Sequence, residues 1–432
     1  MTREIILAVF LFLNIASPAL AASAPIAAGT TLALKECIDI ALSNDPDIKS
    51  LIRTARAQHY AARQQVSAYL PSIAVSAAYL SNHAVKQTVS DPAATSFVTY
   101  DGKSAGAALN QLIFDFGKTP ANIAAANAST LAARYNTDNE AVSVVSEVKQ
   151  AYHALVYAKL VLKLSDETVD QYRRNLSYAK AHFQANIRPK YDVTKAEADL
   201  SSAKLDRIKA ANNVQLAKAY LDNAMNQPNA PDYGVQENTI FVPYPAELDK
   251  VVSVAYDNNP SLLSYLAQVH ALEAQLRVAR RDLYPALNAS GGYNFGGSVS
   301  PISQGWNAGL NLSADIFTGL RKSSKISEQE HRLAALRFTV ESVKLQIFLS
   351  AKQAFLNLNE AAQAKDTATD QVKQATENLE IANLRYKTGL GSPVEISDAT
   401  VMYNTAKTSF LRSLYDYKTA QANLEKVMGS KQ

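Results

Sequence analysis

The feature that most constrains the fold is a duplication that covers nearly all of the 432-residue chain. From residue 113 onward, identical residues recur 203 positions apart, as in Ile113 and Ile316, Arg134 and Arg337, and Leu155 and Leu358. Earlier in each copy the spacing is 214, as in Asn44 and Asn258, Pro46 and Pro260, and Tyr79 and Tyr293. Two tandem copies of about 190 residues indicate a pseudo-symmetric architecture rather than a solenoid of short units.

Each copy contains a long run with neither Gly nor Pro, which in the first copy lies between Pro120 and Gln184. About 65 residues in one helix would span about 97 Å. Val145, Val148 and Tyr152 recur at spacings of three and four, which is typical of a coiled-coil seam. The duplication therefore predicts two matching helical rods.

Short breaks follow the rods, at 185–190 in the first copy and at 388–393 in the second. Beyond the first break we expect a helix from Lys190 to Asn226, and before the first rod a helix from Pro46 to Tyr69. Stacked end to end, these two helices would measure about 90 Å and match one rod. We therefore expect a mainly α fold, a long antiparallel coiled-coil bundle with both breaks at one end.

Strand hairpins are predicted at the other end, at about 72–114 and 286–317, where apolar residues alternate with small or polar ones. The alternating apolar set in the second copy includes Leu287, Ala289, Tyr293 and Phe295. An unbroken small and polar face is typical of strands that line a water-filled lumen. A soluble hairpin packed on the helices is the alternative. Four strands are too few to close a barrel, so several chains would have to share one.

Aromatic residues gather near the ends of these strands, which suits a girdle at the two boundaries of a membrane. This expected membrane girdle comprises Tyr69, Phe97, Tyr100, Phe114, Phe116, Tyr284, Trp306 and Phe317. Beyond residue 21 no stretch is long and apolar enough for a transmembrane helix. Transmembrane β-strands are therefore the expected mode of membrane insertion.

The N-terminus indicates export, because 1–21 has the pattern of a signal peptide: Arg3, an apolar run, and Ala19-Leu20-Ala21 as a cleavage site. The mature chain then divides into a first repeat at 22–225, a linker at the waist of the bundle at 226–248, and a second repeat at 249–432. The single cysteine, Cys37, lies well past the cleavage site. Neither an internal disulfide nor a lipid-bearing N-terminal cysteine is therefore expected.

Composition and motifs argue against several other functions. A formal net charge of +4 is too balanced to favour nucleic acid. The six His are dispersed without the spacing of metal ligands, so we expect no metal site. Gly391-Ser392 lacks the pattern of a nucleophile elbow, and Gly291-Gly292 opens no helix that would hold a phosphate. We predict no catalytic residue and no cofactor, and we do not expect an enzyme.

Two tandem copies with a hairpin between helices, together with 112–118 (LIFDFGK) and 385–390 (RYKTGL), resemble the TolC-like outer-membrane efflux and secretion channels. The resemblance covers essentially the whole mature chain. It implies a homotrimer, in which a 12-stranded barrel in the outer membrane of a Gram-negative bacterium continues into an α-helical tunnel across the periplasm. It also implies a periplasmic adaptor (a membrane fusion protein) and an inner-membrane transporter as partners. The protein would then be the exit duct of a tripartite efflux pump or a type I secretion system.

The resemblance also implies a gate at the periplasmic tip of the tunnel. Its carboxylates would be Glu395 and Asp398, with a further acid at Asp192 and an aromatic residue at Tyr386. The simpler alternative for Glu395 and Asp398 is a solvated helix start, where acids favour the helix dipole. In a trimer, however, the two positions would place six carboxylates around one axis, and such a ring favours cations.

The sequence departs from the family pattern at two places in the tips. The usual basic residue falls on Gly391, and the usual first-repeat glycine falls on Asn186. An Arg–Asp link that closes the tip would therefore need a substitute, for which Arg188 and Lys190 are the candidates.

The exposed hairpin tips are the expected adaptor contacts, and they comprise Asn186, Ile187, Gly389 and Leu390. A periplasmic coiled-coil scaffold or adaptor without a pore is the alternative function, in which the strand hairpins would be soluble caps. The sequence does not specify whether the cargo is drugs, metals or proteins.

Overall fold

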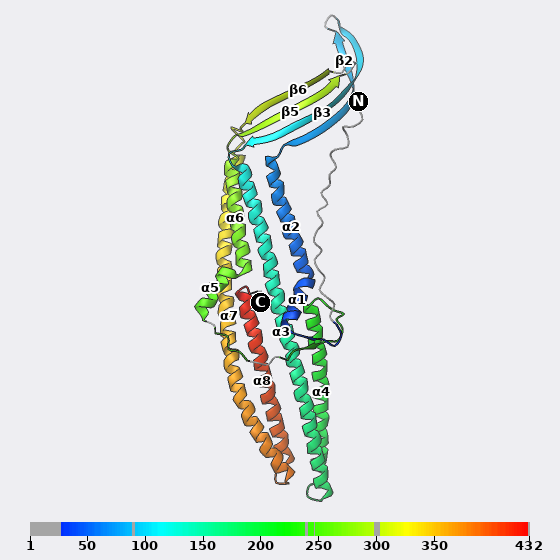
Figure 1. Cartoon of the computed structure of the whole chain (residues 1–432), viewed down its shortest axis with the longest axis vertical. Helices are drawn as coiled ribbons and strands as arrows, with labels where there is room; N and C mark the ends of the chain where they lie inside the picture. Colours follow the sequence, from blue (N-terminus) through cyan, green and yellow to red (C-terminus); the bar gives the residue numbers. More distant parts are fainter. Residues whose placement is uncertain (1–26, 89–90, 238–240, 246, 298–302, 431–432) are drawn as a thin grey trace.

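A computed structural model describes residues 27–88, 91–237, 241–245, 247–297 and 303–430. The chain is elongated, with a sheet at one end and helices along the rest of its length (Figure 1). The signal peptide expected at 1–21 lies outside the described residues.

The two predicted rods are the helices α3 (Lys118–Gln184) and α7 (Arg321–Lys387), each of 67 residues, or about 100 Å. Because α3 begins two residues earlier than expected, Pro120 lies in its first turn, where its missing N–H leaves no bond unmade. Beyond each tip follows a helix of 35 residues, α4 (Lys190–Ala224) or α8 (Pro393–Val427). Each bound of α3 and α4 recurs 203 positions later in α7 and α8, as the duplication predicts.

Shorter helices precede each hairpin, namely α1 (Leu34–Asn44), α2 (Pro46–Val66), α5 (Leu248–Asn258) and α6 (Pro260–Arg281). The Asp45 carboxylate caps α2 by accepting from the Ile48 N–H at 2.7 Å. α2 ends before the predicted Tyr69, because residues 67–69 form a 3-10 turn, η1 (Ser67–Tyr69). α2 and α4 follow one another along α3, so two shorter helices do match one rod (Figure 1).

Alanines at a spacing of seven residues form the coiled-coil seams of the lower half. The buried alanines at this spacing are Ala354, Ala361, Ala368, Ala375 and Ala382 in α7, and Ala196, Ala203, Ala210, Ala217 and Ala224 in α4. A strict repeat of seven keeps the seam on one side only if the helices supercoil to the left. The small side chains let α7 approach α8 closely, and α4 approach α3.

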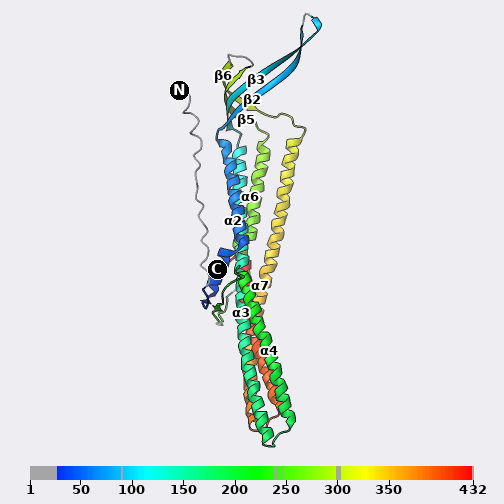
Figure 2. The same cartoon turned by 90° about the vertical axis from the view of Figure 1, so that its right-hand side faces the viewer.

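The sheet has the strand order β2-β3-β5-β6, and all three pairings are antiparallel. Its strands are β2 (Ser72–Thr88), β3 (Asp91–Phe114), β5 (Ala286–Gly297) and β6 (Ser303–Ser313). The second hairpin ends at Ser313 instead of near 317, because residues 314–320 leave the sheet to reach α7. The first hairpin extends beyond the second, as Figure 2 shows.

The strand register confirms the predicted alternation. One cross-strand row consists of Val75, Ala107, Tyr293 and Trp306. The next row, on the opposite face, consists of Ser76, Gly106, Asn294 and Gly305. The four strands therefore share one apolar face and one face of small and polar residues.

The alternative of a soluble hairpin packed on helices is wrong for this sheet, because its apolar face is uncovered. The side chains of Val75, Trp306 and Leu310 are 82%, 78% and 73% exposed. Large exposed apolar patches mark a surface that contacts a partner or a membrane. No helix of the described residues is long and apolar enough to span a membrane.

A core at the waist joins the upper and lower halves of the first repeat. Cys37 of α1, Leu221 of α4 and Met225 are fully buried there against α3. The short strands β1 (Thr31–Leu32) and β4 (Gly234–Val235) pair in parallel beside this core. The linker between the repeats is thereby fastened to the start of the first repeat.

A cavity of about 370 Å³ beside this core is lined by four basic side chains, Lys35, Lys149, His153 and Lys418, and by Glu425. Lys149 is 8% exposed and pairs with Glu425 at 2.5 Å. Burial, and after it the positive charges of Lys418 and Lys149, together lower the pKa of His153 to about 4. His153 is therefore neutral at pH 7.

We predict that acid destabilises the waist through His153. Its pKa is about 4 when folded and about 6.5 when unfolded, so the unfolded chain binds more protons between these values. The stabilisation from neutral His153 is therefore complete above pH 6.5. As the pH falls toward 4, the free energy of unfolding decreases by roughly 3 kcal/mol at most.

His153→Gln should remove this part of the pH dependence, measured as the difference in unfolding temperature between pH 7 and pH 4.5. The matched control is His59→Gln, because His59 is exposed. A H153Q protein that loses as much stability in acid as the wild type would contradict the assignment.

Candidate functional site at the bundle tip

The two tips have the same backbone turn. Asn186 and Gly389, which are 203 positions apart, both have positive φ, at 57° and 78°. In each tip the N–H of the third residue beyond the end of the rod bonds back to a rod carbonyl, as Ile187 does to His182 and Leu390 to Arg385, both at 2.9 Å. This is the Schellman pattern that ends a helix with a left-handed residue. Asn is the residue type that most readily replaces Gly there, so the departure at Asn186 keeps the turn.

Arg188 connects the two tips. Its Nη2 donates to the Gly391 carbonyl at 2.6 Å and to the Gly389 carbonyl at 3.0 Å. Arg188 is also the repeat equivalent of Gly391, since the two positions are 203 residues apart. Of the two candidates named for a closing link, Arg188 therefore crosses between tips, but it binds backbone carbonyls and not a carboxylate.

Gly391 packs against the end of α7 with no room for a side chain. A Cβ built there would lie 2.9 Å from the Tyr386 backbone nitrogen and 3.1 Å from Arg385 atoms. Because the closest atom belongs to the backbone of a helix, a larger residue would shift the turn. The tip is thus built around glycine at the position where the family pattern expects a basic residue.

Asp192 and Tyr386 lie in one buried cluster under the tips. They are 4% and 3% exposed, and Asp192 Oδ2 has no hydrogen-bond partner among the described residues. Burial raises the pKa of Tyr386, the Asp192 carboxylate raises it further, and Arg188 opposes them. The His182 ring packs edge-on against Tyr386, with 6.1 Å between centroids. The structure therefore brings together two of the four expected gate residues.

Glu395 and Asp398 lie apart from this cluster, exposed on the first turns of α8. Glu395 pairs with Arg385 at 3.4 Å, and its backbone N–H is capped by the Ser392 hydroxyl at 3.1 Å. Both charged groups are half exposed, so this ion pair contributes little to stability. Within one chain the two acids fit a solvated helix start, and a ring of acids needs further copies of the chain.

Among the expected adaptor contacts, the two apolar side chains are exposed, Ile187 at 61% and Leu390 at 76%. They occupy equivalent positions in the two repeats and lie at the far end of the bundle from the sheet (Figure 1). Asn186 is exposed and Gly389 is half-buried.

The residues of the expected girdle divide into two groups. Tyr69, Phe114, Phe116, Tyr284 and Phe317 lie where the sheet meets the helices, and Phe116 stacks on Tyr284 with 5.5 Å between centroids. Phe97, Tyr100 and Trp306 lie inside β3 and β6 instead of at strand ends. Their expected position at strand ends is therefore wrong, because the strands extend further toward the hairpin turns than the sequence pattern indicated.

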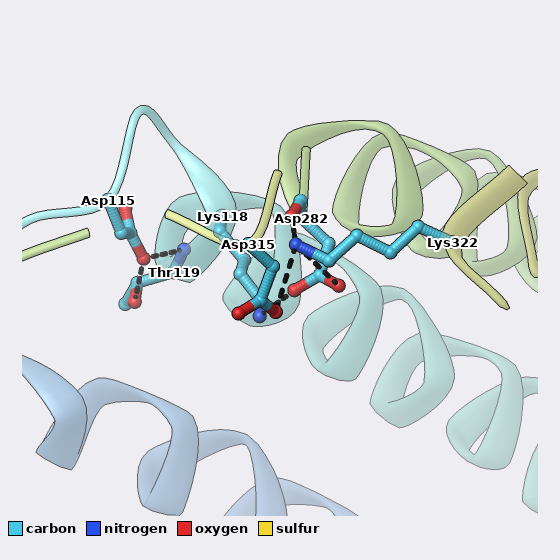
Figure 3. Close-up of polar contacts among 6 residues, drawn as sticks. All are labelled: Asp115, Lys118, Thr119, Asp282, Asp315 and Lys322. Carbon is cyan, nitrogen blue, oxygen red and sulfur yellow. Dashed lines mark hydrogen bonds and ion pairs between the residues drawn. The ribbon is translucent and has the colours of Figure 1, made fainter. Parts of the chain in front are cut away.

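A polar network at the junction of sheet and helices was not predicted from the sequence. Lys118 and Lys322, from the two rods, both reach Asp282 at the end of α6, and Lys322 also pairs with Asp315 at 3.3 Å (Figure 3). These residues are far apart in sequence, and each alone resembles an ordinary surface charge. The signal available in the sequence was a lysine in the first turn of both rods.

We predict that Arg188→Ala loosens the tips without unfolding the bundle. The variant loses two charge-assisted hydrogen bonds, each worth about 1.5–3 kcal/mol. Amides of 185–188 and 388–392 should exchange with deuterium faster, and those of the waist should not change. Lys190→Ala, which removes an exposed charge two residues away, is the control. Unchanged exchange at the tips in R188A would contradict the cross-tip bond.

Comparison with known proteins places this architecture in a family. Residues 37–227 and 251–430 match the family model "Outer membrane efflux protein". The chain is 22% identical to outer membrane protein TolC of Vibrio cholerae over 411 residues, or 92% of this chain and 90% of that protein. It is 24% identical to protein CyaE of Bordetella pertussis over 379 residues, or 84% and 77% of the two chains.

Among solved structures, the CmeC outer membrane channel of Campylobacter jejuni superposes with a TM-score of 0.78 at 20% identity. The superposition covers 92% of this chain and 85% of that one. These matches confirm the predicted fold, and none supports the alternative of a scaffold without a pore. The chain belongs to the outer membrane efflux protein family, and it is an outer-membrane channel-tunnel.

Proposed function

We propose that three copies of this chain close into one duct that crosses the outer membrane and continues through the periplasm. The observation that carries this proposal is the pair of open strand edges on β2 and β6. In a bilayer the backbone groups of an open edge have no water to bond with, so such an edge must be paired. Three sheets of four strands would make a closed barrel of twelve.

The helices support the same closure. Exposed apolar residues of α7 include Phe338, Leu345, Leu349 and Leu356, and those of α2 and α4 include Tyr60, Leu205, Ile208 and Tyr220. α2 and α4 pack on α3, whereas α7 packs on α6 and α8, so these two sets lie on helices at opposite sides of the protomer. A contact between two different surfaces forms a ring when the rotation closes.

The duct acts passively, as the exit of a tripartite efflux pump or of a type I secretion system. The tips are its periplasmic end, and Asn186, Ile187, Gly389 and Leu390 contact the adaptor, which links the duct to an inner-membrane transporter. Support for this role comes from the exposed apolar pair Ile187 and Leu390. Residues 1–21 direct the export of the chain, and the five girdle residues where the sheet meets the helices lie at the membrane boundary.

The purified protein should run as a trimer in detergent and conduct ions in planar bilayers, because pooled strands enclose a lumen lined by small and polar side chains. Mass photometry gives the oligomeric state, and single-channel recording gives the conductance. A membrane-extracted protein that stays monomeric and conducts no ions would refute the proposal.

The tip gate consists of Asp192 and Tyr386 beneath the tips and of Glu395 and Asp398 at the lumen. In the trimer, six carboxylates from the last two positions surround one axis. Two charges about 6 Å apart repel by roughly 3 kcal/mol at an effective dielectric of about 20. Such a ring attracts cations and disfavours anions.

We therefore expect Glu395→Ala with Asp398→Ala to lower cation selectivity, measured as the reversal potential across a salt gradient. The matched control is Glu377→Ala with Glu380→Ala, which removes the same charge from exposed positions on α7. If the reversal potential of E395A/D398A equals that of the wild type, these residues do not belong to the gate.

A further inference from the structure

An open cavity of about 840 Å³ lies at the junction of sheet and helices, between α3, α6 and α7. Its basic lining residues are Lys118, Arg321, Lys322, Lys325 and Arg332, and its acidic ones are Asp282 and Glu328. The cavity is separate from the tip gate and from the strand edges on β2 and β6. Neither of these features accounts for the charged residues that line it.

The carboxylates near the cavity do not balance its positive charge. Asp282 pairs with both Lys118 and Lys322, and Asp315, outside the cavity lining, also pairs with Lys322. Glu328 pairs with Lys325 at 3.0 Å and with Arg332 at 2.6 Å. No described carboxylate pairs with Arg321. The side chains leave a net positive cavity, which favours an anionic ligand.

The equivalent junction in the first repeat has its own anion. The Asp115 carboxylate accepts from the Thr119 N–H at 2.6 Å and from the Thr119 hydroxyl at 2.5 Å (Figure 3). Asp115 therefore places a negative charge at the N-terminus of α3, where the helix dipole stabilises it. This is the arrangement expected for a helix that begins directly beneath a sheet.

The second repeat lacks that anion. Thr318 stands at the position equivalent to Asp115, although the two turns have the same backbone, with positive φ at 116 and 117 and at 319 and 320. The first turn of α7 holds no acidic residue and has no side-chain cap. Free N–H groups at a helix N-terminus form a site for an external anion, and phosphate suits such a site well.

A buried amide in the cavity wall indicates a second kind of contact. Gln329 lines the cavity and is 4% exposed, and its Oε1 has no hydrogen-bond partner among the described residues. Rotation about the last side-chain bond turns this amide readily. The amide oxygen needs a hydrogen-bond donor. The hydroxyl or ammonium of a phospholipid headgroup supplies one.

We propose that this cavity binds the headgroup of a glycerophospholipid from the periplasmic leaflet of the outer membrane. The phosphate would lie at the α7 N-terminus beside Arg321 and Lys325, and Gln329 would accept from the rest of the headgroup. The exposed rings of Phe114, Phe116 and Tyr284 mark this end of the sheet as the membrane boundary. The position of the cavity at the membrane boundary rests on the proposed membrane orientation, whereas its net positive charge does not.

A second copy of the chain would not neutralise the cavity by packing its own edge there. After Asp47, α2 carries no acidic residue, and β2 carries none at all. The edge that a neighbouring protomer offers in the proposed trimer therefore brings no carboxylate to the α7 N-terminus.

The test is native mass spectrometry of the full-length protein extracted from membranes in a mild detergent. The wild type should retain phospholipid, and after delipidation it should rebind dioleoyl phosphatidylglycerol. Arg321→Ala with Lys325→Ala should weaken rebinding about tenfold or more, because removing one charge-assisted hydrogen bond lowers affinity by about that factor. The control, Lys344→Ala with Lys373→Ala, removes the same charge from exposed positions on α7 and should rebind like the wild type.

A second variant tests the site without removing a cation. Thr318→Asp supplies the carboxylate that Asp115 provides in the first repeat and should exclude the lipid phosphate, whereas Thr318→Asn should not. Equal rebinding by T318D, R321A/K325A and the wild type would overturn the proposal. Saturation by millimolar inorganic phosphate without lipid binding would overturn the choice of a lipid. The assay reads lipid in detergent, so its result does not depend on whether the protein conducts ions.

Discussion

The structure depends on one requirement, that the backbone N–H and C=O groups of every strand in a membrane be paired. Within one chain, β3 and β5 have partners on both sides, whereas β2 and β6 each have one. Helices satisfy their own backbone groups, but an open sheet does not. The four strands of one chain therefore leave two unpaired edges in a bilayer. The family to which the chain belongs forms channels in the outer membrane.

The helical part of the protomer is also duplicated, and it also leaves surfaces without a partner. Two rods of 67 residues have apolar side chains on more than one face, and their own chain covers only part of each. In the lower half, seams of alanine bring α4 onto α3 and α7 against α8 at close range. Apolar residues remain exposed on α7 and on α2 and α4. The helical bundle therefore resembles the sheet, because each has surfaces on two sides that lack a partner within the chain.

Differences between the two repeats mark the places with a particular role. Arg188 and Gly391 occupy equivalent positions, yet one is a donor that crosses between the tips and the other leaves no space for a side chain. Asp115 and Thr318 are likewise equivalent, and only the first supplies a carboxylate to its helix. Where the two repeats keep the same structure, as in the turns at Asn186 and Gly389, the residues allow the positive φ that the turn requires.

Much of the fold could be predicted from the sequence because its signals are local and repeated. The absence of Gly and Pro from 121–184 defines a rod, and alternation through Leu287 and Tyr293 defines a strand face. The family resemblance implies that Asp192 and Tyr386 lie near one another at the tip, but it does not imply their burial. Nor does it imply the binding of Arg188 to backbone carbonyls, since no sequence pattern marks a carbonyl as an acceptor. The meeting of Lys118, Asp282 and Lys322 depends on three chain segments converging, which composition and spacing do not reveal.

The most direct measurement of the central claim is a disulfide between the two sheet edges. In one sheet β2 and β6 are three strand spacings apart, about 14 Å, whereas a disulfide needs Cα atoms within about 7 Å. Such a bond can therefore form only between copies, and the native Cys37 is buried and will not interfere. With Ser76→Cys combined in turn with Gly305→Cys, Asn307→Cys and Gly309→Cys, we predict a covalent trimer on denaturing gels for at least one pair. Monomers under oxidising conditions for every pair would contradict the account.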